Sequence, residues 1–274
     1  MKHRNFIYVC SLAGFFSLFA SFIVAANIIV DPLFIFGSKN YRRLNDVRFE
    51  AIRYPALSKF YSFKRIQPRM IILGSSRAEV GLDPEHPGFK LRPVYNSAFP
   101  GTAMVTAWRY FQDAVTAGRL KQAIIAVDFF FFSSRVGAVG ADDDHRFVIG
   151  SDSTATPLLS RTIQHFDDLW LATLSSSTLA ASWQTLIKNN GPKIMTWVQL
   201  KNGLSVLQNP HSFDQHAQFQ LTERGFLTQT YGPQLCLFDE KGSSQQLDAF
   251  SATVRWAYQK GIDLRVLISP SHAR

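Results

Sequence analysis

The chain has 274 residues, of which 46% are hydrophobic and 18% are charged, and this composition excludes an intrinsically disordered protein. The net charge of +9 is uneven: residues 1–70 hold 11 Lys and Arg against 3 Asp and Glu, a net of +8. Cys10 and Cys236 are not expected to pair, because Cys10 lies inside a long apolar run, and this excludes a disulfide framework. We expect no metal and no cofactor, since no Cys/His cluster has zinc spacing and no phosphate-binding Gly-rich loop is present.

The first predicted element is a transmembrane anchor at residues 1–30. The run Phe6–Val30 contains no charged residue, and about 20 apolar residues cross the hydrocarbon core of a bilayer. A cleaved signal peptide is the alternative, with Val24 and Ala26 at a cleavage site, but the apolar core of a signal peptide spans only about 7–15 residues. The length therefore favours a retained anchor.

A basic juxtamembrane segment is predicted at residues 31–68. It includes the runs KNYRRLNDVRF and SKFYSFKRIQPR, which either contact anionic lipid headgroups or form a solvated amphipathic linker helix. We expect no nucleic-acid partner. Lys2 and Arg4 precede the anchor and favour a cytoplasmic N-terminus. We thus expect a single-pass protein of the plasma (inner) membrane with its domain on the extracytoplasmic side; a cytoplasm-facing basic protein is the other topology.

Residues 69–274 are predicted to form one α/β domain with a parallel sheet. Short, strongly apolar runs alternate with segments of helical periodicity, which is typical of strands covered by helices. The expected strands lie at 70–73, 93–96, 121–132 and 264–269, and the expected helices at 102–118 and 243–260.

A large insertion or lid is predicted at 133–242, within this domain. The segment is rich in Ser, Thr, Asn, Gln and Gly, with helical stretches expected near 160–186 and 193–206. The chain stops at Arg274, directly after the last predicted buried strand. Because a covering helix normally follows such a strand, we expect the domain to be truncated at its C-terminus.

Two loops at predicted strand ends carry the residues that favour chemistry. Gly74-Ser75-Ser76-Arg77 follows the first strand, and Asn96 with Gly101 follows the second. Ligands of open parallel sheets bind beyond the carboxyl ends of the strands, where a serine hydroxyl is exposed and backbone N–H groups can stabilise an oxyanion. The competing interpretation is an ordinary serine N-cap after a tight turn.

These two loops resemble blocks of the SGNH hydrolase superfamily. Gly74-Ser75-Ser76 with Gly81 is similar to its first block, and Asn96 with Gly101 is similar to its second. The closer resemblance is to membrane-anchored members with a Gly-Ser-Ser variant, including the D-alanyl transfer proteins of teichoic acid and the alginate O-acetylation proteins. The resemblance implies a flavodoxin-like three-layer fold, Ser76 as the nucleophile, and oxyanion contacts from the backbone N–H groups of Ser76 and Gly101.

The chain departs from the superfamily pattern in two blocks. Asp128 stands where the third block usually has Asn, either as a substrate-site residue or as a structural carboxylate held by loop N–H groups. The last block is usually Asp-x-x-His, and its nearest match here is Ser269-Pro270-Ser271-His272. His272 is the triad base, a pocket residue or a surface histidine, and the base could instead come from a later segment.

The sequence leaves two functions open. The first is an anchored acyl esterase or O-acyltransferase that acts through a serine nucleophile on cell-envelope glycans or their carriers. The second is a non-catalytic envelope assembly or binding protein on the same fold, with envelope proteins as partners. The acidic run beside His145 is either a cation site or, as we favour, a solvated loop.

Overall fold

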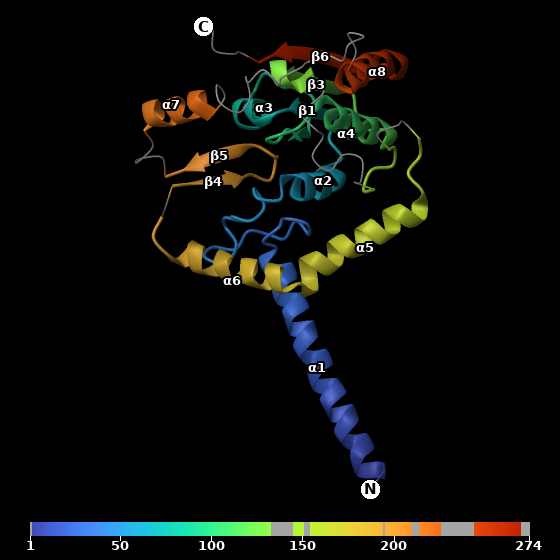
Figure 1. Ribbon diagram of the computed structural model, residues 1–274, viewed down its shortest axis with the longest axis vertical. Helices are drawn as coiled ribbons and strands as arrows, with labels where there is room; N and C mark the ends of the chain where they lie inside the picture. The colour runs from blue at the N-terminus through green and yellow to red at the C-terminus, as the bar shows by residue number, and fades with distance from the viewer. Residues whose placement is uncertain are drawn as a thin grey trace. The chain divides into compact units, whose positions relative to one another are not determined.

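The computed structural model describes residues 2–132, 145–150, 154–193, 195–209, 214–225 and 244–269 (Figure 1). The chain divides into two compact units. The helical unit comprises Met1–Tyr61 and His165–Lys193, and the sheet unit comprises Ser62–Gln164 and Ile194–Arg274. The segment predicted as a single insertion at 133–242 is thereby shared between the two units.

The helical unit begins with α1, which spans Lys2–Val30. Its uncharged stretch Asn5–Val30 has 26 residues, and at 1.5 Å per residue it is about 39 Å long, against about 30 Å of hydrocarbon in a bilayer. Its large side chains from Phe6 to Phe22 are exposed. Among the described helices, α1 alone is long and apolar enough to cross a membrane. The helix ends where predicted, because Asp31 turns the chain with a positive φ of 50°.

Three further helices lie wholly or partly in the helical unit: α2 at Pro55–Ile66, α5 at Leu158–Leu174 and α6 at Ser176–Asn190. Ser175 separates α5 from α6 and caps α6 by accepting a hydrogen bond from the Thr178 N–H at 3.1 Å. Asn189 of α6 both accepts from and donates to the backbone of Val47. The positions of α5 and α6 confirm the helical stretches expected near 160–186.

The sheet unit contains a four-stranded parallel sheet in the order β2-β1-β3-β6. Its strands are β1 at Met70–Gly74, β2 at Val94–Asn96, β3 at Gln122–Val127 and β6 at Asp263–Ile268. Helices α3 (Ser76–Gly81), α4 (Met104–Thr116) and α8 (Gln245–Lys260) connect or precede these strands. The predicted α/β class with a parallel sheet is confirmed.

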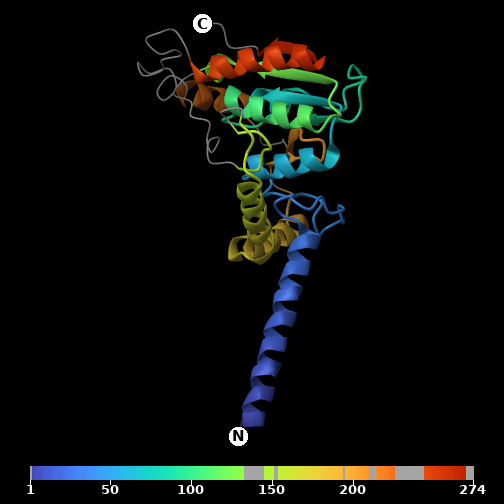
Figure 2. The ribbon, with the colours of Figure 1, turned by 90° about the vertical axis from the view of Figure 1, so that its right-hand side faces the viewer.

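Helices α4 and α8 run side by side on one face of this sheet (Figure 2). The rings of Trp108 and Trp256 meet edge to face between them, with centroids 5.4 Å apart. Every residue of β1 is buried, as expected for a central strand covered on both faces. α8 stops at Gly261, which adopts a left-handed φ of 64°, as its place after the last apolar turn predicted.

Strand β6 corrects one expectation. Its position was predicted, but its side chains were expected to be buried and most of them are exposed, including Ile268 at 80%. β6 is an edge strand with β3 as its partner, but edge position alone does not expose side chains, since β2 at the opposite edge is fully buried; the difference lies in what covers the faces of each strand. Strand β3 is also shorter than predicted: it ends at Val127, and Phe129–Phe132 form a turn of 3-10 helix, η1.

The helix expected near 193–206 is wrong. A two-stranded antiparallel hairpin occupies this region, with β4 at Thr196–Gln199 and β5 at Ser205–Gln208. The turn contains Asn202-Gly203, a pair that strongly favours hairpins. Gly203 has φ of 86°, and a Cβ there would lie 2.0 Å from the carbonyl oxygen of Asn96. Helix α7 follows at Gln215–Gly225.

The basic segment is only partly solvated. Arg48 and Lys59 are buried, and Lys64 of α2 forms an ion pair with the buried Asp113 of α4. The guanidinium of Arg48 also lies 4.6 Å from the centre of the Phe34 ring. These cations serve internal contacts, so only part of the positive charge counted in the sequence faces solvent.

Candidate functional site

The candidate site lies at the carboxyl edge of the parallel sheet. In the strand register Gly74 is level with Ala126, and Ile72 is level with Asn96. Parallel strands with this register bring the residues that follow β1, β2 and β3 to the same edge. The Asn96 side chain after β2 accordingly reaches the helix that follows β1, and Asp128 after β3 reaches Ser75.

Ser75, Arg77 and Asp128 form a hydrogen-bonded network at this edge. The Ser75 hydroxyl donates to one carboxylate oxygen of Asp128, and the Arg77 guanidinium donates to the other at 3.0 Å. Ser75 also caps α3 by accepting from the Arg77 N–H at 3.3 Å. Asp128 is buried while the Arg77 side chain is 35% exposed, so the network pairs an enclosed carboxylate with a half-open cation.

Ser76 lies in a different environment from Ser75. It is the first residue of α3 and is exposed, whereas Ser75 is half-buried. Its hydroxyl forms no hydrogen bond with the part of the chain that the structure describes. The two adjacent serines thus differ in environment. The Ser75 hydroxyl is hydrogen-bonded at the sheet edge, whereas Ser76 is accessible from solvent.

Asn96 is completely buried, and its side chain is committed to the backbone. Its amide donates to the carbonyl oxygens of Ala78 at 2.8 Å and Leu82 at 2.9 Å, which end α3. Its side-chain oxygen accepts from the Ala98 N–H at 3.0 Å. In this arrangement Asn96 ties the end of α3 to β2 and the loop after it, a contact that needs a donor and an acceptor on one short side chain.

The two glycines at the edge differ in what they do. Gly74 has φ of 153°, and a Cβ there would lie 2.9 Å from the Ala126 carbonyl oxygen, so the residue allows β1 and β3 to approach. Gly101 has φ of 72°, and a Cβ would meet nothing within 4 Å. The requirement at Gly101 is therefore one of backbone conformation, and the space beside it is open.

Sequence reasoning missed three polar residues at or near this edge. Glu79 of α3 is buried and accepts a hydrogen bond from the Ser205 hydroxyl of β5 at 2.8 Å. Ser97 is 2% exposed, and its hydroxyl finds no hydrogen-bond partner among the described residues. The pairing of Glu79 with Ser205 had no signal in the sequence, since the two residues are 126 positions apart.

The proposed base, His272, lies outside the described residues, and so does the acidic run before His145. Four histidines have described side chains: His86, His145, His165 and His216. None of them is hydrogen-bonded to Ser75 or Ser76; His165, for example, contacts the Tyr61 hydroxyl at 2.9 Å in the helical unit. Within the described ranges, no group of acidic, His or Cys side chains could hold a metal ion.

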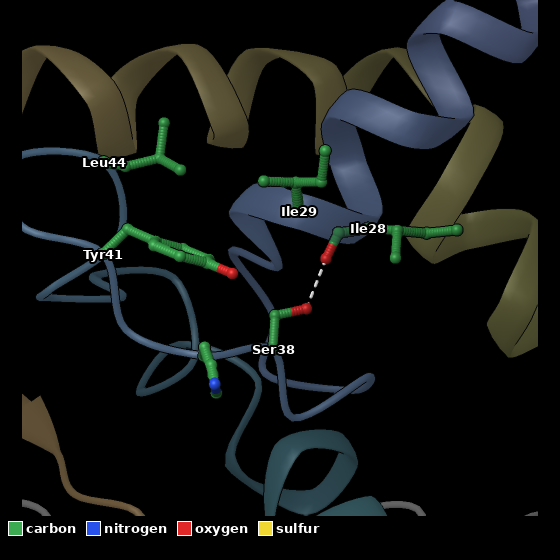
Figure 3. Close-up of a pocket in the computed structure, with 6 residues that line it drawn as sticks. Ile28, Ile29, Ser38, Tyr41 and Leu44 are labelled. Atoms are coloured by element: carbon green, nitrogen blue, oxygen red, sulfur yellow. Dashed lines mark hydrogen bonds between the residues drawn. The ribbon is translucent and has the colours of Figure 1, made fainter.

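A separate hollow of about 450 Å³ lies in the helical unit, beside the last turn of α1 (Figure 3). Its lining is largely apolar and comprises Ile28, Ile29, Ser38, Lys39, Tyr41 and Leu44. The Ser38 hydroxyl closes one side by donating to the Ile28 carbonyl oxygen at 2.5 Å. Ser38, Lys39 and Tyr41 supply the polar groups of this lining.

No protein-family model, curated protein or solved structure matches this chain.

Proposed function

We propose that the chain is a membrane-anchored acyl esterase or O-acyltransferase of SGNH-like type, with Ser76 as its nucleophile. Its α1 helix would cross the plasma membrane once and leave the sheet unit on the extracytoplasmic side. The substrates would be acyl esters of envelope glycans or of their carriers. The proposal extends the resemblance at Gly74-Ser75-Ser76 and at Asn96 with Gly101.

The observation that supports it most is the division of labour between the two serines. The Ser75 hydroxyl donates a hydrogen bond to Asp128, whereas Ser76, the next residue at the carboxyl edge of the sheet, is exposed. A nucleophilic hydroxyl must be accessible to the substrate. A hydroxyl that stabilises the loop must instead be held in a hydrogen bond. In our proposal the oxygen of the acyl group lies in the open space beside Gly101.

In the proposed reaction the Ser76 oxygen attacks the ester carbonyl carbon and forms a tetrahedral oxyanion. The bond from that carbon to the leaving alkoxide breaks, and the alkoxide takes up the proton that Ser76 has lost. A water or a sugar hydroxyl then attacks the acyl-serine and releases Ser76. The step requires a general base, for which His272 is the candidate in this chain. Asp128 is occupied by Ser75 and Arg77 and is assigned a positioning role.

A non-catalytic envelope assembly or binding protein is the second candidate. It is favoured by the closed network of Ser75, Arg77 and Asp128, in which each carboxylate oxygen already has a donor. It is also favoured by the lack of a hydrogen bond from any described histidine side chain to Ser76.

A fluorophosphonate probe separates the two candidates. We expect the purified full-length protein to be labelled, Ser76→Ala to abolish labelling, and His272→Ala to reduce it strongly. Ser75→Ala is the matched control: it removes the neighbouring hydroxyl, an N-cap and a hydrogen bond to the buried Asp128 carboxylate, costs about 2–4 kcal/mol of stability, and should keep most of the labelling of the folded protein. Loss of labelling in Ser75→Ala but not in Ser76→Ala would show that Ser75, and not Ser76, is the nucleophile. A folded protein that is never labelled would support the binding protein.

A further inference from the structure

Two rows of large apolar side chains are exposed on the helical unit. Each row follows one helix at a spacing of four residues, so its members share one face. Their side chains are between 37% and 66% exposed. We call them the apolar rows: Phe166, Trp170 and Leu174 on α5, and Leu179, Trp183 and Ile187 on α6.

The opposite faces of these helices are small and polar. The buried residues are Asp168 and Ala172 on this part of α5, and Thr178, Ala181, Ser182 and Thr185 on α6. A helix on the surface of a water-soluble protein has the reverse arrangement, with its apolar face inside and its polar face in water. Both helices thus point their polar faces inward and their apolar faces outward, which suits a non-aqueous surrounding.

The junction of α5 and α6 is fastened to the C-terminal end of α1. The buried Asn27 donates to the Thr173 carbonyl oxygen at 2.8 Å and accepts from the Ser182 hydroxyl at 2.7 Å. Asn27 precedes the last residue of α1, Val30, by three positions, which is about 5 Å along the helix axis. Figure 1 shows α6 crossing this end of α1.

This level of α1 is where a membrane span leaves the hydrocarbon. The apolar stretch exceeds the thickness of the core by about 9 Å, so a span centred on this stretch would place the last turn of α1 at the headgroup boundary. Lys39, Arg42 and Arg43 are exposed on the loop that follows α1, and the Asn190 amide of α6 donates to the Arg43 carbonyl oxygen at 2.8 Å. The basic loop and α6 therefore belong to the same layer of the helical unit.

We propose that the apolar rows lie in the interface of the bilayer that α1 crosses, with Trp170 and Trp183 at the boundary between headgroups and acyl chains. Interfacial helices bury an apolar face in this boundary, and tryptophan is enriched there. The basic loop supplies the attraction to anionic headgroups. The proposal rests on α1 as a membrane span and is independent of any chemistry at Ser76.

Tryptophan fluorescence in vesicles of anionic phospholipid tests this placement, because α1 contains no tryptophan. We use the membrane-embedded full-length protein and lipids brominated either near the headgroup end or near the terminal methyl of the acyl chains. We expect stronger quenching by the first lipid, and we expect Trp170→Phe combined with Trp183→Phe to remove most of it. Phenylalanine keeps the apolar surface, so the fold is retained.

Trp197→Phe is the matched control. Trp197 is 40% exposed but lies on β4 in the sheet unit, and its replacement should leave the quenching nearly unchanged. The proposal is overturned if the double variant is quenched as strongly as the parent protein. It is also overturned if the embedded parent protein is not quenched at all, an outcome that would assign the apolar rows to a protein partner. Neither result depends on fluorophosphonate labelling, so the two proposals fail separately.

Discussion

Replacing Asn96 with alanine is expected to destabilise the sheet unit strongly. The side chain is completely buried and satisfies three backbone groups: the carbonyl oxygens of Ala78 and Leu82, and the N–H of Ala98. Alanine leaves all three without this partner at the point where α3, β2 and the following loop meet. The substitution removes no charge and little apolar surface, so the lost hydrogen bonds dominate the effect.

The magnitude follows mainly from two groups, the Leu82 carbonyl oxygen and the Ala98 N–H, because the Ala78 carbonyl oxygen still accepts from the Leu82 N–H at 3.2 Å. Each buried polar group without a partner costs about 1–3 kcal/mol, and water that enters the vacated space recovers part of this. We therefore expect a loss of about 2–4 kcal/mol in the free energy of unfolding. For a unit of this size about 1 kcal/mol corresponds to 2–4 °C, so the melting temperature should fall by about 4–16 °C.

Urea unfolding of the full chain in mild detergent, followed by tryptophan fluorescence, measures this loss. Asn190→Ala is the matched control, since the Asn190 amide also donates to two carbonyl oxygens, of Arg43 and Leu186, but is exposed. Water replaces its bonds, and we expect a cost below about 1 kcal/mol. An Asn96→Ala protein as stable as the parent, or no less stable than Asn190→Ala, would refute the reasoning.

Two further predictions concern the same strand. Gly203→Ala should prevent the β4–β5 hairpin from packing against β2, because the new Cβ would clash with the Asn96 carbonyl oxygen and the backbone at this position has a positive φ. Limited proteolysis should therefore cut within residues 195–209 faster than in the parent protein. An unchanged cleavage pattern would contradict the predicted clash. Complete burial raises the pKa of Tyr95 well above its ordinary value. The folded protein thus loses stability as pH rises above about 10, and ultraviolet titration should show at least one tyrosine that ionises only on unfolding. Ionisation of every tyrosine in the folded protein would contradict this.

Local sequence patterns were sufficient for the main elements of the fold. The uncharged run before Asp31 predicted α1, and the unbroken apolar run before Gly74 predicted β1. Both runs are apolar on every side, which indicates an element that has no polar face. The two loops were expected at the same sheet edge because parallel strands bring their carboxyl ends together, and Asn96 does contact the helix that follows β1. The hairpin β4–β5 was predictable from Asn202-Gly203 and was missed because helical spacing was given more weight.

The side-chain partners were decided by tertiary structure alone. Nothing near Ser75 in the chain indicates that its hydroxyl meets Asp128, 53 residues later, or that Asn96 turns its amide toward the carbonyl oxygens of α3. The same holds for β6, whose apolar run predicted a buried strand although most of its side chains are exposed. Periodicity encodes which face of an element is apolar, whereas the identity of the neighbour on that face depends on how distant segments come together.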